Sequence, residues 1–520
     1  MIRAILACAA VALATLWAEG SGARQWWAHV EFLAADRLMG RDTGSEGHKE
    51  AARYIAHEFE RAGLRPKGIE GYSQPVRLRK LSIEEGASSL ALEDGGRVVP
   101  LKLGEDAYFS LRGNLDAEVN APMAFAGYGF SVPEKNYDEL AGLDVKGKVV
   151  VYLTGGPRGI PPVLLSHNQS SGVRWARLRE AGAIGIGIIA NPRTTDIPWA
   201  RARLARLLPS MQLADFPPEG PRAAIVINPD RVNLFFEGTG HTMEELLDLA
   251  AKGEPLPKFD LKARIRAKVK ITVSNVDSEN VVGFKEGSHA ERKHEFVILS
   301  AHFDHIGVGE NLDGDKIYNG AMDNAAGVAS LIEVARQLSG KAAARSILFL
   351  AVTGEEKGLL GSRYFAHSPA VPREAIAADL NLDMFLPLFA FRRLTVYGLD
   401  ESTLGETVER VAEKAGIIVQ RDPDPQRNSF IRSDQYSFIE RGIPALAFKL
   451  GYAPGSGEEK IFKTWLKERY HSPSDDLTQP VDKEAAARFN KLMASIVLAV
   501  ADDPQRPRWL STSFFQRYAR

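Results

Sequence analysis

The spacing of apolar positions changes twice along the chain. Residues 25–66 show helical spacing, and a stripe within Glu50–Leu64 predicts a helix that ends near Gly63. The stripe consists of Ala51, Ile55, Phe59 and Ala62. Between Pro122 and Val273 the pattern becomes short β-rich runs separated by glycine and proline. The runs are Pro122–Tyr128, Lys148–Leu153, Ile184–Ile189 and Arg222–Ile227.

After Asn280, apolar strand-like runs alternate with amphipathic helical segments. The strand-like runs are Phe296–Ala301, Ile347–Val352 and Ala378–Leu382. The clearest helix carries Val328, Leu331, Ile332, Ala335 and Leu338 at i, i+3, i+4, i+7 spacing. This alternation predicts an α/β fold with a doubly wound, mixed or parallel sheet, interrupted by the β-rich module.

These patterns predict a division of the chain into five parts. They are a signal peptide (1–18), an N-terminal part of the main domain (19–113), an inserted module (114–275), a catalytic domain (276–505) and a C-terminal tail (506–520). The tail is short and polar-aromatic, and no role is assigned to it.

Residues 1–18 have the pattern of a secretory signal peptide, with Arg3 before an apolar run from Ala4 to Leu16 and small residues after it. The run is shorter than the ~20 residues that span a bilayer, so no stable membrane insertion is expected. The only cysteine is Cys8, in a stretch that weakly resembles a lipoprotein cleavage box. Cleavage would leave an exported protein, periplasmic or secreted, that is stabilised by packing and not by disulfides.

The composition and charge of the chain limit the classes of binding partner that we expect. The chain has 520 residues, 45% of them hydrophobic, which is enough for two or three domains with large cores. Its 65 basic and 66 acidic residues leave a net charge of −1, without a long block of either sign. Nucleic acids and anionic membranes favour a basic face, so neither is expected as a partner.

Five short clusters rich in metal-ligand side chains follow one another in the C-terminal half. They are Ala301–His305, Gly320–Asn324, Gly354–Glu356, Asn381–Met384 and Tyr470–Pro473. Several come directly after a predicted strand, and open α/β sheets bind ligands outside the carboxyl ends of their strands. The clusters are therefore expected at one edge of the sheet.

Each cluster alone has an ordinary explanation. A His-x-Asp-His stretch can be a hydrogen-bonding knot, an Asp-Asn pair a helix cap, and adjacent glutamates solvated charge. As an ordered set, two imidazoles and three carboxylates suit a pair of divalent ions with one carboxylate bridging. Glu355 lies beside a ligand, where a water-activating base is needed. Other histidines, such as His57, His241 and His367, have no such neighbours and are interpreted as structural or exposed.

The clusters resemble those of the co-catalytic di-zinc aminopeptidase family, which includes bacterial leucyl aminopeptidases, glutamate carboxypeptidase, glutaminyl cyclase and the transferrin receptor. The resemblance extends to Leu33–Asp36 and Gly40–Ser45 near the N-terminus. Gly127–Gly129 and Gly142–Val149 resemble the protease-associated (PA) domain that many members carry as an insertion.

The resemblance implies a role for each residue of the clusters. One zinc would be held by His302, Asp323 and Asp383, and the other by Asp323, Glu356 and His471. Glu355 would be the general base, and Asp304 would orient His302. Tyr470 is a candidate oxyanion donor, and Arg432 a candidate substrate contact. The bond after the bridging Asp323 is often cis in relatives.

Charge counting agrees with this ligand set. Two zinc ions bring four positive charges, and the carboxylates of Asp323, Glu356 and Asp383 bring three negative ones. One hydroxide neutralises the remainder, and hydroxide is the nucleophile that a two-zinc site generates.

The resulting hypothesis is an exported zinc aminopeptidase that uses two Zn²⁺ ions to release N-terminal residues from peptides. A carboxypeptidase or dipeptidase of the same clan is the first alternative, and it would need a cation for the substrate carboxylate, from Arg392, Arg393 or Arg432. A glutaminyl cyclase needs only one zinc and is disfavoured by the full ligand set. A receptor-like binding protein is the alternative from another class, and the complete ligand set with Glu355 speaks against it. The sequence leaves the preferred residue, the metal used in cells and the oligomeric state open.

Overall fold

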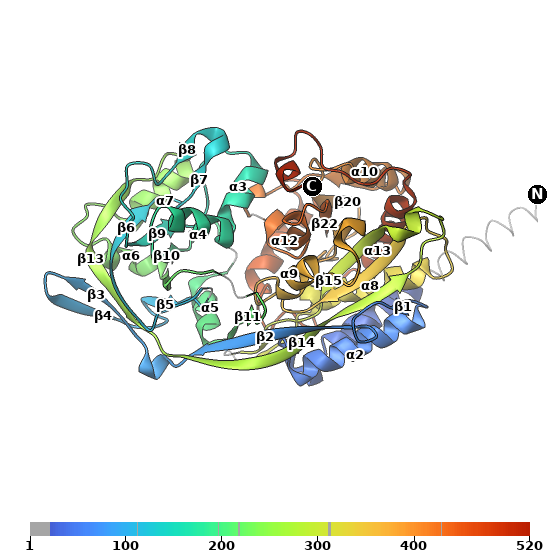
Figure 1. Cartoon of the computed structure of the whole chain (residues 1–520), viewed down its shortest axis with the longest axis horizontal. Helices are drawn as coiled ribbons and strands as arrows, with labels where there is room; N and C mark the ends of the chain where they lie inside the picture. The colour runs from blue at the N-terminus through green and yellow to red at the C-terminus, as the bar shows by residue number, and fades with distance from the viewer. Residues whose placement is uncertain are drawn as a thin grey trace, which may run out of the picture. The chain divides into compact units, whose positions relative to one another are not determined.

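The computed structural model describes residues 21–519, except 112, 196, 217–218, 310–313 and 428 (Figure 1). The predicted signal peptide and Cys8 lie outside the described residues. The chain forms two compact units: unit 1 comprises residues up to Arg77, Asp277–Pro423 and Arg432–Arg520, and unit 2 comprises Leu78–Val276 and Asp424–Ile431. Among the described residues, no helix is both long and apolar enough to cross a membrane.

Unit 1 is built on a mixed sheet whose central strands are parallel. Its strands in spatial order are β14 (Ile271–Lys285), β18 (Ser346–Val352), β15 (Phe296–His302), β19 (Ile376–Asn381), β22 (Ala445–Leu450), β20 (Arg393–Tyr397) and β21 (Ile418–Gln420). β15 runs parallel to β18 and β19, and β19 runs parallel to β22, whereas β14 and β20 join antiparallel. Every residue of β15, β18 and β19 is buried, which explains why the strands are mostly apolar, although β19 also buries Asp379 and Asn381. The predicted α/β fold with a mixed sheet is confirmed.

Helices cover this sheet. They are α2 (Glu46–Arg61), α8 (Ala326–Leu338), α9 (Leu360–His367), α10 (Leu404–Lys414), α11 (Gln435–Ile439), α12 (Gly457–Glu468) and α13 (Lys483–Asp502), preceded by helical residues 21–33. α8 and α13 pack against each other and against β15 (Figure 1). On the other face of the sheet, Asn381 of β19 donates a hydrogen bond to Gln435 of α11 (2.8 Å). The two contacts place helices on both faces.

Helix α2 shows how the sequence specifies a boundary. The hydroxyl of Ser45 caps its first turn by accepting a hydrogen bond from the backbone N–H of His48 (3.2 Å). The predicted stripe is buried, and the chain leaves the helix through Gly63, whose φ of 78° suits a residue without a side chain. Both the helix and its end are as predicted.

Unit 2 contains a second mixed sheet. Its strands in spatial order are β4 (Arg97–Leu101), β3 (Ser89–Asp94), β13 (Lys258–Lys268), β6 (Glu118–Ala126), β9 (Val149–Leu153), β10 (Gly185–Ile189), β12 (Ala223–Ile227) and β5 (Ala107–Phe109). The four predicted runs correspond to β6, β9, β10 and β12. Its helices are α3 (Pro162–Gln169), α4 (Ser171–Glu180), α5 (Trp199–Ala202), α6 (Val232–Phe235) and α7 (Met243–Lys252).

The second unit begins at Leu78, earlier than the predicted start of the insertion at residue 114. The reason is strand pairing: β3 pairs with β13, β4 with β3, and β5 with β12. Residues 89–109 therefore belong to the sheet of unit 2. The chain passes between the units within β2 (Ser73–Ile83) and within β14.

The C-terminal tail packs on unit 1. The indole of Trp509 donates to the carbonyl of Gly442 (2.9 Å), and the hydroxyl of Ser513 donates to Glu401 Oε2 (2.7 Å).

Candidate metal centre

The carboxyl ends of three neighbouring strands deliver most of the candidate ligands. His302 is the last residue of β15, Glu355 and Glu356 follow β18, and Asp383 follows β19. Because these strands are parallel and adjacent, their ends lie at one edge of the sheet. The convergence predicted from the sequence is thus present in the backbone.

Asp323 comes from a short helical turn, Ala321–Ala325, in front of α8. Its peptide bond to Asn324 is cis, as the resemblance implied. The buried carboxylate of Asp475 accepts hydrogen bonds from the backbone N–H groups of Met322 (2.9 Å) and Asp323 (3.0 Å). Asp475 follows His471 by four residues, so it ties the His471 loop to the Asp323 turn.

Asp304 organises the turn that carries the two glutamates. Its carboxylate accepts hydrogen bonds from the backbone N–H groups of Glu355 (3.0 Å) and Glu356 (3.4 Å). His302 Nδ1 lies 3.2 Å from the carbonyl oxygen of Asp304 and 3.8 Å from its carboxylate. The contact that orients the imidazole is therefore mainly with the main chain of Asp304.

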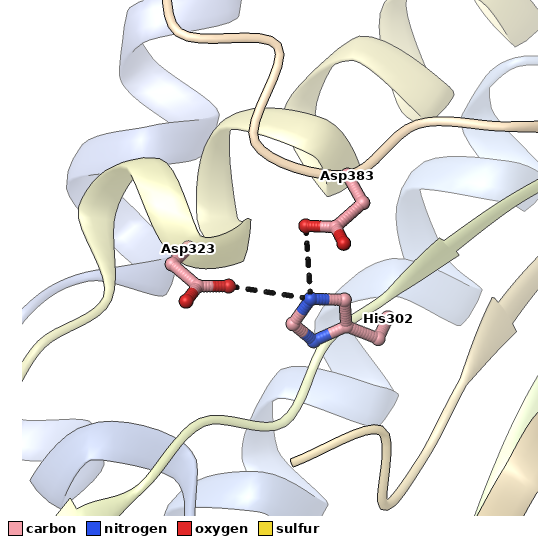
Figure 2. A group of neighbouring side chains, drawn as sticks. All are labelled: His302, Asp323 and Asp383. Atoms are coloured by element: carbon pink, nitrogen blue, oxygen red, sulfur yellow. Dashed lines mark ion pairs between the residues drawn. The ribbon is translucent and has the colours of Figure 1, made fainter. Parts of the chain in front are cut away.

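Asp323 is placed between two histidines. Its Oδ1 lies 3.4 Å from His302 Nε2, and its Oδ2 lies 3.4 Å from His471 Nε2. His302 Nε2 is also 3.5 Å from Asp383 Oδ1, and His471 Nε2 is 3.2 Å from Glu356 Oε2. Figure 2 shows the first of these groups, with both carboxylates directed at one ring nitrogen of His302.

These separations suit ligands of a common ion better than direct hydrogen bonds. Two atoms each ~2.0–2.1 Å from a tetrahedral zinc ion lie roughly 3.3 Å apart. Direct charge-assisted hydrogen bonds are shorter, about 2.7–2.9 Å. Among the described residues, His302 Nε2 and Asp383 Oδ1 are buried without a hydrogen-bond partner. Buried polar atoms rarely lack partners, so the donor set fits two divalent cations that share Asp323.

The second group contains a histidine that the sequence analysis did not single out. His305, Asp323 and Glu356 offer ligand atoms close enough together to hold one ion. His305 is fully buried, and its Nδ1 lies 2.7 Å from Glu356 Oε1. Within the described part of the chain, neither ring nitrogen of His305 makes a hydrogen bond of normal geometry. Glu356 therefore faces His471 with one oxygen and His305 with the other.

Burial and neighbouring charges shift the pKa values of the adjacent Glu355 and Glu356 in opposite directions. Burial raises the pKa of Glu355 well above its ordinary value, and the negative charges of Glu356 and Asp383 act in the same direction. Burial would also raise the pKa of Glu356, but the facing His471 and His305 hold it well below its ordinary value. A carboxyl group with a raised pKa binds a proton more readily than a solvated one, which suits it to acid–base chemistry.

Arg432 is exposed, and Tyr470, the residue before His471, is half-buried. The ring of Tyr470 is 4.0 Å from that of His471 between centroids, and Arg432 Nη2 donates to the Tyr470 hydroxyl (3.2 Å). Burial raises the pKa of Tyr470, so the phenol stays protonated in the physiological range.

Three comparisons relate the chain to known proteins. Residues 280–497 match the family model for peptidase family M28. Aminopeptidase YwaD of Bacillus subtilis (strain 168) is 26% identical over 239 residues, which is 45% of this chain and 47% of the relative. A probable leucine aminopeptidase 2 of Aspergillus oryzae is 28% identical over 232 residues, 41% of this chain and 46% of the relative. The chain thus spans about half the length of these relatives.

Among solved structures, an aminopeptidase from Aneurinibacillus sp. strain AM-1 aligns with a TM-score of 0.54 at 20% identity. The alignment covers 94% of each chain, which shows a shared fold across both units.

Proposed function

We propose, from the match of residues 280–497 to the model for peptidase family M28, that the chain is an exported zinc-dependent aminopeptidase. The observation that carries the proposal is the position of Asp323, with one carboxylate oxygen 3.4 Å from His302 and the other 3.4 Å from His471. A carboxylate held between two imidazoles in this way suits a bridge between two ions. Unit 2 is proposed to be the PA domain.

Five side chains would hold the ions. His302 and Asp383 would bind the first, Glu356 and His471 the second, and Asp323 both. Zinc ions at such a site supply Lewis acidity and make a bound water more acidic. The protein's part is to position the ligands and to exclude competing hydrogen-bond partners.

Glu355 is proposed to move the protons. Its carboxylate would accept a proton from the attacking water and later donate it to the departing amine of the cleaved peptide. Glu355 follows strand β18 directly beside the ligand Glu356, which places the base next to the ions without making it a ligand. The burial that raises its pKa makes it a stronger base than a solvated glutamate.

Tyr470 is proposed to stabilise the negative oxygen that forms on the scissile carbonyl. Its hydroxyl already accepts a hydrogen bond from Arg432, so its own proton can be directed at the substrate. Arg432 would strengthen this donor by withdrawing charge from the phenol oxygen.

Arg432 also favours a second candidate function. An exposed guanidinium beside Tyr470, the residue preceding His471, could pair with a substrate carboxylate, as a carboxypeptidase requires. Three versions of one peptide separate the two activities: free at both ends, acetylated at the amine, and amidated at the carboxyl end. We expect acetylation to abolish cleavage and amidation to leave it intact; the reverse would identify a carboxypeptidase.

The same assay tests the base. Glu355→Gln should lower turnover by about 10²–10⁴-fold while zinc content stays unchanged. Glu401→Gln is the matched control, because Glu401 is a buried carboxyl of the same unit that accepts from Ser513 of the tail. Normal turnover in the Glu355 variant would remove the proposed mechanism.

A further inference from the structure

A short segment near the N-terminus, Gly40–Thr43, lies among the turns that carry the candidate ligands. Gly40 has a φ of 66°, and a β-carbon there would lie 2.4 Å from the carbonyl oxygen of Tyr318 and 2.5 Å from that of Gly307. Only glycine fits such a close approach. Arg41 follows with a φ of 49°, a left-handed conformation that costs a residue with a β-carbon about 1 kcal/mol. The backbone is thus held in an unfavourable conformation that directs the Arg41 side chain inward.

The guanidinium of Arg41 bonds the main chain of two ligand-bearing turns at once. The side chain is only 1% exposed. Its Nε donates to the carbonyl of Phe303 (2.9 Å), the residue after His302. Nη1 donates to the carbonyl of Asn319 (2.7 Å) and Nη2 to that of Gly320 (3.1 Å), at the entrance to the Asp323 turn. Nη1 also contacts the carbonyl of Leu33.

Neighbouring residues of the segment reach the remaining turn. The Thr43 hydroxyl donates to Asp304 Oδ2 (3.0 Å), and Asp304 in turn accepts the backbone N–H of Glu355. Asp42 Oδ1 forms an ion pair with Nζ of Lys357 (2.7 Å), and Lys357 is the residue that follows Glu356. The segment therefore touches the β15, Asp323 and β18 turns, which are distant from it in sequence.

We propose that Arg41, assisted by Thr43, is a positioning residue for both metal sites, holding the His302 and Asp323 turns at the separation that two ions require. The inference rests on the proposed function, because it assumes that these turns bind metal. A guanidinium offers five donors in a rigid planar fork, so it can fix several carbonyl oxygens at defined positions, whereas the three donors of a lysine ammonium have no fixed planar arrangement.

The charge of Arg41 has a second effect. Burial lowers the pKa of Arg41 to about 10, which leaves the side chain charged at neutral pH. Its positive charge lies near the carboxylates of Asp304, Asp475, Asp323 and Glu356. It offsets part of the repulsion among them before any ion binds.

The test is Arg41→Lys, which keeps the charge but removes the fork. Zinc affinity of each site would be measured by competition with a chromogenic chelator, and the ligand geometry by the visible spectrum of the cobalt(II)-loaded protein. We expect both sites to weaken by about 10–100-fold, the usual effect of losing a group that orients metal ligands, and the cobalt spectrum to change. The matched control is Arg345→Lys, because Arg345 is also 1% exposed and donates to main-chain carbonyls, those of Val500 and Asp503. It should lower thermal stability without changing either affinity.

Wild-type affinities at both sites in a folded Arg41→Lys protein would overturn the inference. If that variant does not fold, Thr43→Val decides, because it removes one hydrogen bond to Asp304 at nearly constant volume; unchanged zinc affinity there would overturn it equally. A wild-type protein that binds neither zinc nor cobalt would refute the proposed function instead, so the two failures are distinguishable.

Discussion

Acid should destabilise this protein through one buried histidine, His48 of α2. The side chain is 0% exposed, and its Nε2 lies 2.9 Å from the hydroxyl of Thr353, two residues before Glu355. Its ring stacks on Phe303, with 4.3 Å between ring centroids. Burial lowers the pKa of His48 from 6.5 to about 3, and the positive charges of Arg41 and Lys49 add to the effect. The folded protein therefore holds this imidazole neutral.

The direction and size of this pH effect on stability follow from the difference between the pKa of His48 in the folded chain and in the unfolded chain. Below pH 6.5 the unfolded chain binds a proton at His48 that the folded chain rejects until about pH 3, so the contribution to stability is complete above pH 6.5 and is lost on acidification. Each unit of difference is worth ~1.4 kcal/mol. Because pH 4.5 lies about two pH units below the pKa of the unfolded chain, the free energy of unfolding falls by about 3 kcal/mol between pH 7.5 and pH 4.5.

The assay compares the wild type with His48→Gln, both stripped of metal because acid also releases metal from its ligands. Glutamine cannot be protonated but can still bond Thr353. Denaturant unfolding at pH 7.5 and pH 4.5 should show that the wild type loses about 3 kcal/mol more than the variant. His57→Gln is the matched control on the same helix, since His57 is exposed, and it should behave as the wild type. Equal losses in the wild type and in His48→Gln would refute the reasoning.

Elemental analysis should distinguish the two sites, because His302→Ala should lose one zinc, His471→Ala the other, and Asp323→Ala both. Equal loss of zinc in all three variants would argue against a bridging Asp323. His305→Asn should weaken only the second site, by about 10–100-fold in a chelator titration, because the ring contacts Glu356 and not His302 or Asp383; a change at the first site would contradict this assignment. Replacing residues 78–276 by a short linker should preserve zinc binding and cleavage of a small amino-acid amide, but alter activity on longer peptides; a folded deletion variant without zinc would show that unit 2 helps to build the centre.

The strands and their ends were predictable because their signal is local. β15, β18 and β19 are buried over their whole length, so each appears in the sequence as a mostly apolar segment. The residue after such a run leaves the sheet at its carboxyl edge, which is where the clusters containing Glu355 and Asp383 occur. The start of unit 2 was not predictable in this way. β3 alternates between buried and partly exposed residues, and its partner β13 follows more than 160 positions later.

Three residues near the candidate ligands could not be identified from the sequence, for a different reason. His305, Asp475 and Arg41 act through contacts with segments far away in the sequence, and each stands where a simpler explanation was available. An arginine beside glycine in a polar stretch looks like a surface turn, because almost all arginines are exposed unless paired. The family resemblance included Gly40–Ser45, yet the burial of Arg41 and its carbonyl partners appear only once the chain is folded.

Glu355 and Glu356 show how folding assigns different chemistry to identical neighbours. The sequence distinguishes them only through the family resemblance, which implies Glu356 as the ligand and Glu355 as the base. In the folded chain Glu356 faces two imidazoles, which hold its pKa well below the ordinary value, so it remains an anion ready to bind a cation. Glu355 is buried near further carboxylates, which raises its pKa, so it can take and release a proton. Paired carboxyl groups whose surroundings push their pKa values apart generally divide the work of catalysis between them. The proposed assignment of Glu356 as ligand and Glu355 as base is therefore supported by His305 and His471, which face Glu356 directly.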